Sequence, residues 1–290
     1  MRGFLTYGTY RLLGALAGPL PPEIGYRLAR PAGLLFHAFS PRFRRILSHN
    51  FRHVLGADAG EDQVQALVHK ACTNIMKSHY DLFRLSRLSM DEICEITKIE
   101  GVEYLEQALT LGKGVIVLSA HFGNIDIVGQ VPLAYGVRFS APVQHIQPER
   151  LFQYTLRLRQ SHGLRMFPAD GPLMELYRAL KRGEMIGLPC DRGISDNTRA
   201  VKFFGATAFL PEGPVRLALH TGAALVPAFG LRLPDNTFLA WVEPPLELAR
   251  TGDQEADIAA GMEMVVEVLE RTISRYPDQW LVAAPVWPMD

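Results

Sequence analysis

The segment Lys113–Gly129, KGVIVLSAHFGNIDIVG, constrains the fold of this chain more than any other stretch. It begins with an apolar run, Val115–Ser119, that has the length and composition of a buried strand. We expect this strand to lead through a turn into a helix, with His121 at the carboxyl end of the strand. Ligands of open α/β sheets tend to bind at such strand ends. The helix should carry three apolar side chains into the core: Ile125, Ile127 and Val128.

His121 and Asp126 are five residues apart in this segment. On one regular helix, residues three or four apart face each other, so a contact requires His121 on the turn and Asp126 at the helix start. Such a pair can act in general-base catalysis, because one imidazole nitrogen removes a proton from a substrate while the carboxylate holds the other N–H. Backbone N–H groups at the helix start could stabilise an oxyanion. The alternative is a core histidine, with Asp126 on a solvated face.

The rest of the chain alternates strand-like and helix-like segments. This alternation predicts an α/β fold with a mixed, largely parallel central sheet flanked by helices. The expected strands are Ile96–Glu100, Val115–Ser119, Arg138–Val143, Leu164–Phe167, Met185–Pro189, Ala224–Leu233 and Thr237–Val242. A long helix is expected over Asp62–Leu88. Its polar residues could face the site, but we favour a solvated face for Asn74, His79, Asp81 and Arg84.

Basic and apolar residues are concentrated at the N-terminus. Residues 1–53 contain eight Arg and one Glu, a net charge of +7, and the chain as a whole is neutral. The apolar stretch Gly3–Leu20 is interrupted by Arg11 and closed by prolines, whereas a bilayer span needs about 20 apolar residues. We therefore expect residues 1–40 to be an interfacial helical segment on an anionic membrane surface. A buried scaffold helix is the alternative, and nucleic acid is disfavoured because the arginines are interleaved with Leu, Phe and Tyr.

Residues 41–290 are expected to form one α/β domain, because no linker divides them and 290 residues can build one large core. The three cysteines are widely spaced and form no CxxC pair. They predict neither a disulfide framework nor a zinc site, and a reducing cytoplasm suits them. The cysteines are Cys72, Cys94 and Cys190.

Five blocks follow one another between His121 and Trp280, and the resemblance that they carry extends over about residues 40–285. They are His121–Asp126 (HFGNID), Gln147–Gly163, Asp191-Arg192 followed by VKFFG, the LPEGP segment from Leu210 with Leu225-Val226-Pro227, and Tyr276–Trp280 (YPDQW). Together they resemble the lysophospholipid acyltransferase-like superfamily, and within it the bacterial lipid A biosynthesis (lauroyl/myristoyl) acyltransferase family. Most lipid A enzymes of this family end the first block with Glu. The aspartate here, with the FFG and PEGP segments, looks more like the family members that acylate phosphatidylinositol mannosides.

The resemblance implies transfer of a fatty acyl chain from an acyl carrier protein or coenzyme A thioester to a hydroxyl of a membrane glycolipid. The acceptor would be a lipid A precursor or a phosphatidylinositol mannoside. His121 would be the general base and Asp126 would orient it, with no metal or redox cofactor. The protein would be peripheral or monotopic on the cytoplasmic face of the inner membrane. Substrate-binding roles are implied for Gly123, Asn124, Glu149, Arg159, Asp191 and Arg192.

Each of these residues also has a structural interpretation. Capping of the helix is the favoured role of Asn124, and the charged residues could form ion pairs. Two other functions also remain open: a His/Asp-dependent thioesterase or hydrolase, and a non-catalytic lipid-binding or assembly protein on the same fold. The sequence has no G-x-S-x-G nucleophile motif, which weakens serine hydrolysis but not activation of water.

Overall fold

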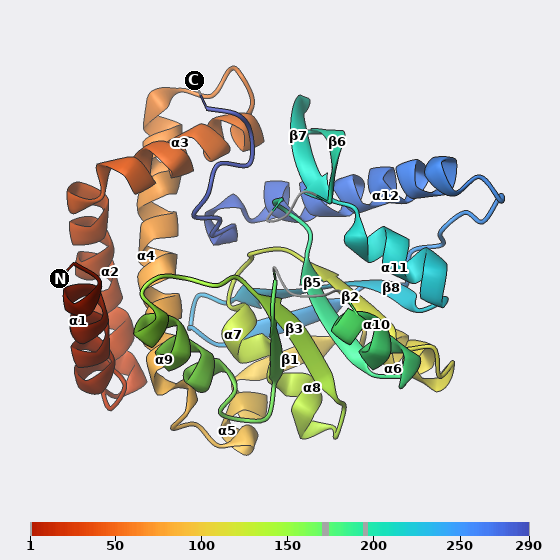
Figure 1. The fold of residues 1–290 in the computed structure, drawn as a ribbon. Helices are drawn as coiled ribbons and strands as arrows, with labels where there is room; N and C mark the ends of the chain where they lie inside the picture. Colours follow the sequence, from red (N-terminus) through yellow and green to blue (C-terminus); the bar gives the residue numbers. More distant parts are fainter. Residues whose placement is uncertain (1, 170–173, 194–196, 290) are drawn as a thin grey trace.

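A seven-stranded sheet forms the centre of the molecule (Figure 1). The computed structural model describes residues 2–169, 174–193 and 197–289, with side chains from residue 6 onward. The strand order is β1-β9-β8-β2-β5-β3-β4, and all neighbours are parallel except β8 and β9. The bounds are β1 Thr97–Glu100, β2 Val115–Ser119, β3 Phe139–Val143, β4 Arg165–Pro168, β5 Met185–Pro189, β8 Ala224–Arg232 and β9 Phe238–Val242. The predicted α/β class is confirmed.

Every strand predicted for this sheet is present, with ends shifted by at most one residue. One hairpin is missing from the prediction: β6 (Thr198–Phe203) pairs antiparallel with β7 (Ala206–Pro211). Its two-residue turn, Phe204 and Gly205, has positive φ at both positions. Such turns suit the twist of a hairpin, but Asn-Gly or Asp-Gly is their usual sequence signal.

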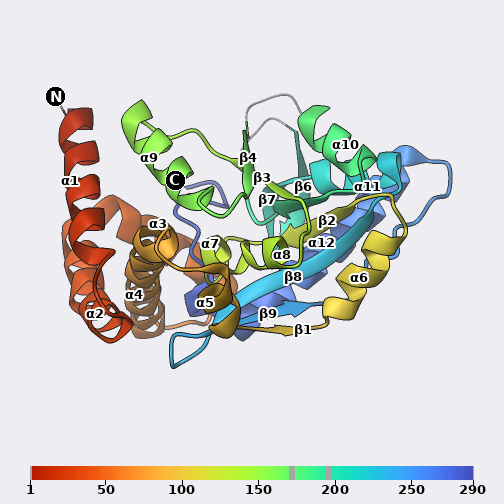
Figure 2. The same ribbon diagram turned by 90° about the horizontal axis from the view of Figure 1, so that it is seen from below.

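Different helices cover the two faces of the sheet (Figure 2). Successive side chains of a strand point to opposite faces. In β2, Ile116 and Leu118 therefore pack with α10, α11 and α12, whereas Val115 and Val117 face α6 and α8. The bounds are α6 Val102–Thr110, α8 Val131–Ala134, α10 Met174–Lys181, α11 Gly213–Thr221 and α12 Gln254–Arg275.

The N-terminal helices stand as a layer beside the sheet (Figure 1). They are α1 Arg2–Ala17, α2 Pro22–Phe39, α3 Pro41–Leu55 and α4 Glu61–Leu85, and the short α5 Met90–Glu95 follows. The predicted solvated face of α4 is wrong. Asp81 and Arg84 are buried under α2, and Asn74 and His79 hydrogen-bond to the C-terminal segment and to α1.

Helices α1 and α2 pack inward through glycines. A Cβ at Gly25 would lie 2.2 Å from the Tyr80 ring of α4, and one at Gly33 would lie 2.9 Å from the Thr73 backbone. Large apolar side chains occupy the exposed positions of the two helices instead: Leu12, Leu13, Leu16, Ile24, Leu28, Leu34, Leu35 and Phe39. Among the described residues, no helix is long and apolar enough to cross a bilayer.

Candidate active site

Two side chains, His121 and Asp191, meet at the carboxyl ends of β2 and β5. These strands are parallel neighbours, with Ser119 opposite Pro189, so the residues that follow them emerge side by side. His121 Nδ1 lies 2.8 Å from Asp191 Oδ1, and the His121 backbone N–H donates to Asp191 Oδ2 at 2.9 Å. The carboxylate thus binds both the ring and the main chain of the same histidine.

Asp191 is fully buried and accepts a third hydrogen bond, from the indole Nε1 of Trp280 at 2.8 Å. Burial alone would raise the pKa of the Asp191 carboxyl. The pKa is instead held below its usual range, because the attraction of His121 and the hydrogen bonds from His121 and Trp280 outweigh the burial. Asp191 is therefore an ionised acceptor at neutral pH.

This arrangement fixes the protonation pattern of His121. The ionised carboxylate accepts a hydrogen bond from Nδ1–H, so in the neutral ring Nε2 carries the lone pair. Nε2 has no hydrogen-bond partner within the described ranges, and the His121 side chain is 25% exposed. A partly exposed, oriented imidazole with a free lone pair has the form of a general base.

The prediction that Asp126 orients His121 is wrong. Asp126 lies on α7 (Ile125–Val128), and its carboxylate accepts hydrogen bonds from Arg159 Nε at 2.8 Å and from Arg159 Nη2 at 3.4 Å. Arg159 is the last residue of α9 (Glu149–Arg159), and the nearby Asp126 charge raises its pKa. The helix directs Asp126 toward α9, while the parallel strand β5 already supplies Asp191 to the imidazole.

Gly123 and Asn124 shape the turn between these groups. Gly123 has φ +57°, and a Cβ there would lie 1.6 Å from the Gly230 carbonyl oxygen, so a side chain cannot be accommodated. Asn124 Oδ1 accepts from the backbone N–H groups of Asp126 and Ile127, which makes it the cap of α7. Its Nδ2 donates to Asp81 at 2.7 Å. Both ends of the Asn124 amide are thus engaged within the protein.

Two of the proposed binding residues form their hydrogen bonds outside the His121–Asp191 pair. Glu149, at the start of α9, is exposed and bonds to His145 and Gln153. Arg192 follows Asp191 directly and donates to Gln144 at 2.8 Å, while its buried Nε has no partner in the part of the chain that the structure describes. Arg192 is therefore more available to a ligand than Arg159, which is paired with Asp126. The described residues hold no group of His, Cys, Asp and Glu that could bind a metal ion.

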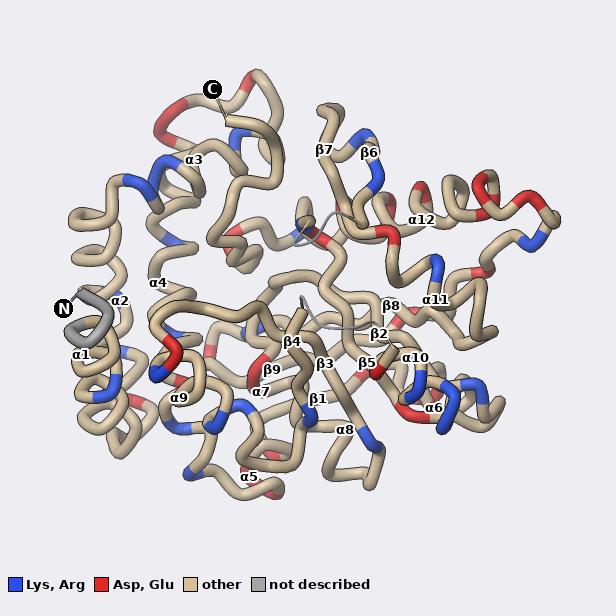
Figure 3. The backbone as a smooth tube through the Cα atoms, viewed as in Figure 1, with Lys and Arg blue, Asp and Glu red and all other residues tan. Residues whose placement is uncertain are grey.

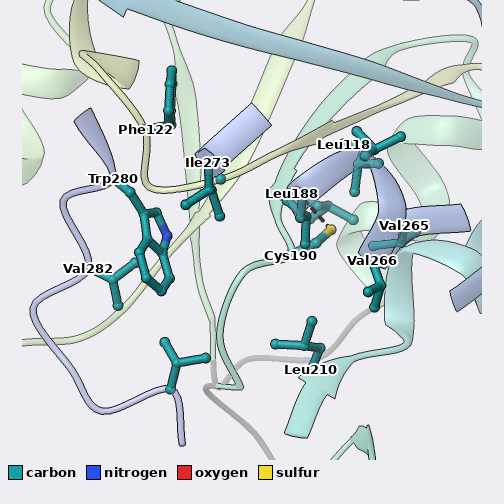
Figure 4. Packing of buried hydrophobic residues seen from close by; sticks show 14 of the residues in the cluster. Leu118, Phe122, Leu188, Cys190, Leu210, Val265, Val266, Ile273, Trp280 and Val282 are labelled. Carbon is teal, nitrogen blue, oxygen red and sulfur yellow. Dashed lines mark hydrogen bonds between the residues drawn. The ribbon is translucent and has the colours of Figure 1, made fainter. Parts of the chain in front are cut away.

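The C-terminal segment packs against the turn, a contact that no local sequence pattern predicts. The Gln279 carbonyl accepts from the Gly123 N–H, and the Leu281 N–H donates to the His121 carbonyl. Trp280 packs in the core near Phe122, Ile273 and Val282 (Figure 4). The signal available in the sequence was the YPDQW block, whose tryptophan holds the site carboxylate.

An apolar cavity of about 220 Å³ lies between the sheet and helices α6, α7 and α8. It reaches the site at Ser119, Asp126 and Pro189. The sheet face under it carries small side chains, including Ala141, Ala228 and Ala240, which leaves space below the helices. Ile125, expected in the core, is 38% exposed and lines this cavity. Ile127 is fully buried as expected.

Comparison with known proteins identifies the family of the chain. The family described as "Bacterial lipid A biosynthesis acyltransferase" matches residues 4–287. The chain belongs to this family. It is therefore an O-acyltransferase, and the resemblance of the five sequence blocks is confirmed.

Among family members, the chain is similar to two proteins named "Phosphatidylinositol mannoside acyltransferase". The protein from Mycolicibacterium smegmatis is 26% identical over 251 residues, which are 84% of this chain and 79% of the relative. The protein from Mycobacterium tuberculosis is 28% identical over 196 residues, which are 66% of this chain and 60% of the relative. The second comparison thus spans less than two thirds of its relative.

Proposed function

We propose that this protein transfers a fatty acyl chain from an acyl thioester to a hydroxyl of a membrane glycolipid, with His121 as the general base and Asp191 orienting it. The observation that carries this proposal is the apolar cavity that reaches the strand ends beside this pair. An apolar cavity binds a hydrocarbon chain by removing its surface from water. The names of the relatives favour a phosphatidylinositol mannoside over a lipid A precursor as the acceptor.

The chemistry follows from the orientation of the imidazole. Nε2 of His121 takes the proton of the acceptor hydroxyl while the hydroxyl oxygen attacks the thioester carbonyl. The carbon–sulfur bond breaks, and the leaving thiolate receives the proton from the imidazolium. The products are an ester and a free thiol, and no acyl-enzyme forms. Asp191, already ionised, stabilises the transient imidazolium.

Arg192 is the residue we propose for the donor. Both thioester carriers, acyl carrier protein and coenzyme A, present phosphate groups, which a guanidinium binds well. Arg192 follows Asp191 directly, and its guanidinium bonds only to a neutral amide among the described residues. Burial lowers its pKa, and the Asp191 charge opposes this effect. A phosphate of the donor would therefore neutralise the positive charge of Arg192, whose hydrogen-bond partner in the protein is a neutral amide.

Helices α1 and α2 support a location on the membrane surface. Their exposed positions carry large apolar side chains while Gly14, Gly25 and Gly33 are buried, which reverses the usual distribution of a water-soluble helix pair. Arginines accompany this surface, whereas acidic residues gather along α12 (Figure 3). We propose peripheral or monotopic binding to the anionic cytoplasmic face of the inner membrane, where the acceptor headgroup can reach His121.

The proposal is tested by incubating the purified protein with acyl-CoA or acyl carrier protein thioesters and with either phosphatidylinositol mannosides or lipid A precursors. Mass spectrometry should show a glycolipid whose mass has increased by one acyl group. Release of free fatty acid in place of an ester would indicate the hydrolase. Product formation that is unchanged in His121→Ala would contradict the proposed mechanism, and absence of any reaction with all donors and acceptors would favour a binding protein.

A further inference from the structure

A second buried carboxylate, Asp81 of α4, lies behind the catalytic turn. Asp81 is only 1% exposed. Oδ1 accepts from the Tyr26 hydroxyl of α2 at 2.6 Å. Oδ2 accepts from Asn124 Nδ2 at 2.7 Å and from the Arg232 guanidinium at the end of β8. One carboxylate therefore joins α2, α4, β8 and the turn that carries His121.

The contact to Asn124 is the link to the site. The oxygen of the Asn124 amide caps α7 at the N–H groups of Asp126 and Ile127, at 3.1 and 3.2 Å. Its nitrogen can then only donate, and Asp81 is its acceptor. The turn is thus fixed at two points, at His121 by Asp191 and at Asn124 by Asp81.

A buried ion pair is poor evidence for stability, because an apolar pair of similar volume often stabilises as much. The Arg232–Asp81 pair also leaves Arg232 Nη1 buried without a partner in the described chain. The residues around the Arg232–Asp81 pair instead connect it to the turn that carries His121. Gln279 bonds to both the N–H and the carbonyl of Arg232 through its side chain, and its own carbonyl accepts from Gly123.

We propose that Asp81 is a positioning residue for acyl transfer, which acts through Asn124 to hold the turn between His121 and Asp126. The hydrogen bond from Tyr26 to Asp81 connects α2 to the same turn. Helix α2 also carries part of the exposed apolar surface. This inference depends on the proposed function. It adds a second anchor that neither contacts substrate nor belongs to the His121–Asp191 pair.

The test is a double-mutant cycle on kcat between Asp81→Asn and Asn124→Ala, assayed well below the unfolding temperatures of all variants. An asparagine at position 81 cannot accept from all three donors, so the amide of Asn124 loses its fixed position. A small displacement of a catalytic group can lower the rate by about 100-fold, and we expect Asp81→Asn to lower kcat by about 10- to 100-fold with KM unchanged. In the Asn124→Ala background, adding Asp81→Asn should lower kcat no further.

Multiplying effects in the cycle, or a wild-type kcat in Asp81→Asn, would overturn the proposal. The matched control is Asp257→Asn. Asp257 is also a buried carboxylate, but it accepts from Thr251 ahead of α12, far along the chain from the turn. This control should lower the melting temperature and leave kcat unchanged.

Hydrogen–deuterium exchange gives a readout that does not need activity. Exchange at the N–H groups of Asp126 and Ile127 should become faster in Asp81→Asn and stay unchanged in Asp257→Asn. If Asp81→Asn does not fold, Tyr26→Phe decides, since it removes one hydroxyl and keeps the ion pair; faster exchange in the turn supports the proposal and wild-type exchange overturns it. If the wild type makes no glycolipid ester, the proposed function fails, and the exchange data still report whether Asp81 holds the turn.

Discussion

His121 and Asp191 meet at 2.8 Å although 70 residues separate them in the sequence. The contact exists because β2 and β5 are parallel neighbours whose carboxyl ends coincide. The pairing in the site is therefore determined by the sheet topology. Asp126, which is closer to His121 in the sequence, pairs with Arg159 instead.

The first prediction concerns Asp191→Asn. The amide would present an N–H₂ group to one of the donors that now bind Asp191, so the orientation of His121 is lost. We expect kcat to fall by about 100- to 10,000-fold, the usual range for a general-base contribution. His121→Ala should fall as far, and combining both should add little. Trp280→Phe, which removes one of three donors, should have a smaller effect. Steady-state kinetics of the four variants test this, and a nearly normal kcat in Asp191→Asn would refute the dyad.

The second prediction concerns acid stability. The pKa of Asp191 is lower in the folded protein than its unfolded value of about 3.9. The carboxylate therefore stabilises the fold fully above the unfolded pKa, and this contribution disappears as the pH falls through the folded pKa. The difference in unfolding free energy between wild type and Asp191→Asn should be largest at pH 7 and should shrink below about pH 4. Urea denaturation at a series of pH values measures it; a difference that grows in acid would contradict the assignment.

The third prediction treats Asp126 and Arg159 as one unit. Removing either charge leaves the other in a mostly shielded place, with exposed side-chain fractions of 16% for Asp126 and 29% for Arg159. We expect Asp126→Asn and Arg159→Gln each to lower kcat/KM by at least about tenfold, and the double variant to be no worse than the poorer single variant. Effects that multiply would show that the two residues act separately.

The fourth prediction concerns the apolar cavity. Ala228→Leu and Ala240→Leu add volume to its sheet face, so less space remains for an acyl chain. Each methylene that no longer enters the cavity loses about 0.8 kcal/mol, or roughly a fourfold change in preference. The variants should therefore favour shorter acyl thioesters when donors of several lengths compete. An unchanged product distribution, with the larger side chains present, would exclude this cavity as the acyl site.

The fifth prediction concerns the exposed side of α2. Leu28, Leu35 and Phe39 are exposed and lie at helical spacing on one side of the helix. Replacing all three by Gln should weaken binding to anionic vesicles by at least about 100-fold, since each buried side chain of this size contributes about 1.5–3 kcal/mol. Deleting α1 and α2 is a poorer experiment, because their glycine faces pack on α4.

The control for this prediction exchanges three exposed apolar residues elsewhere. Leu111→Gln, Met174→Gln and Phe209→Gln remove comparable surface from other parts of the molecule. This triple variant should sediment with vesicles as the wild type does. Equal loss of binding in both triple variants would show that α2 has no special role.

The sheet could be predicted because its strands are local features. Val115–Ser119 and Met185–Pro189 are short apolar runs between turns, and each appears where its pattern indicated. The β6–β7 hairpin was missed because Phe204-Gly205 lacks the usual turn residues. Secondary structure can thus be predicted from the sequence where a segment has its own local pattern.

The partners in the site were harder to predict because they depend on strand order. Nearness in the sequence favours Asp126 as the partner of His121, whereas the pairing of β2 with β5 that selects Asp191 has no local signal. Asp81 was assigned to solvent because the polar side of α4 looks the same whether water or α2 covers it. The sequence marks Trp280 only as part of the YPDQW block, because its role arises from a contact with Asp191, 89 residues away.

The closing of Tyr276–Trp280 around the His121 turn also has a consequence for biogenesis. A ribosome makes His121 early and Trp280 much later, so a nascent chain can complete the sheet around β2 and β5 before the indole exists that steadies the carboxylate. Until this segment has been synthesised and docks, the nascent chain lacks the indole hydrogen bond to Asp191 and the two main-chain hydrogen bonds to the His121 turn.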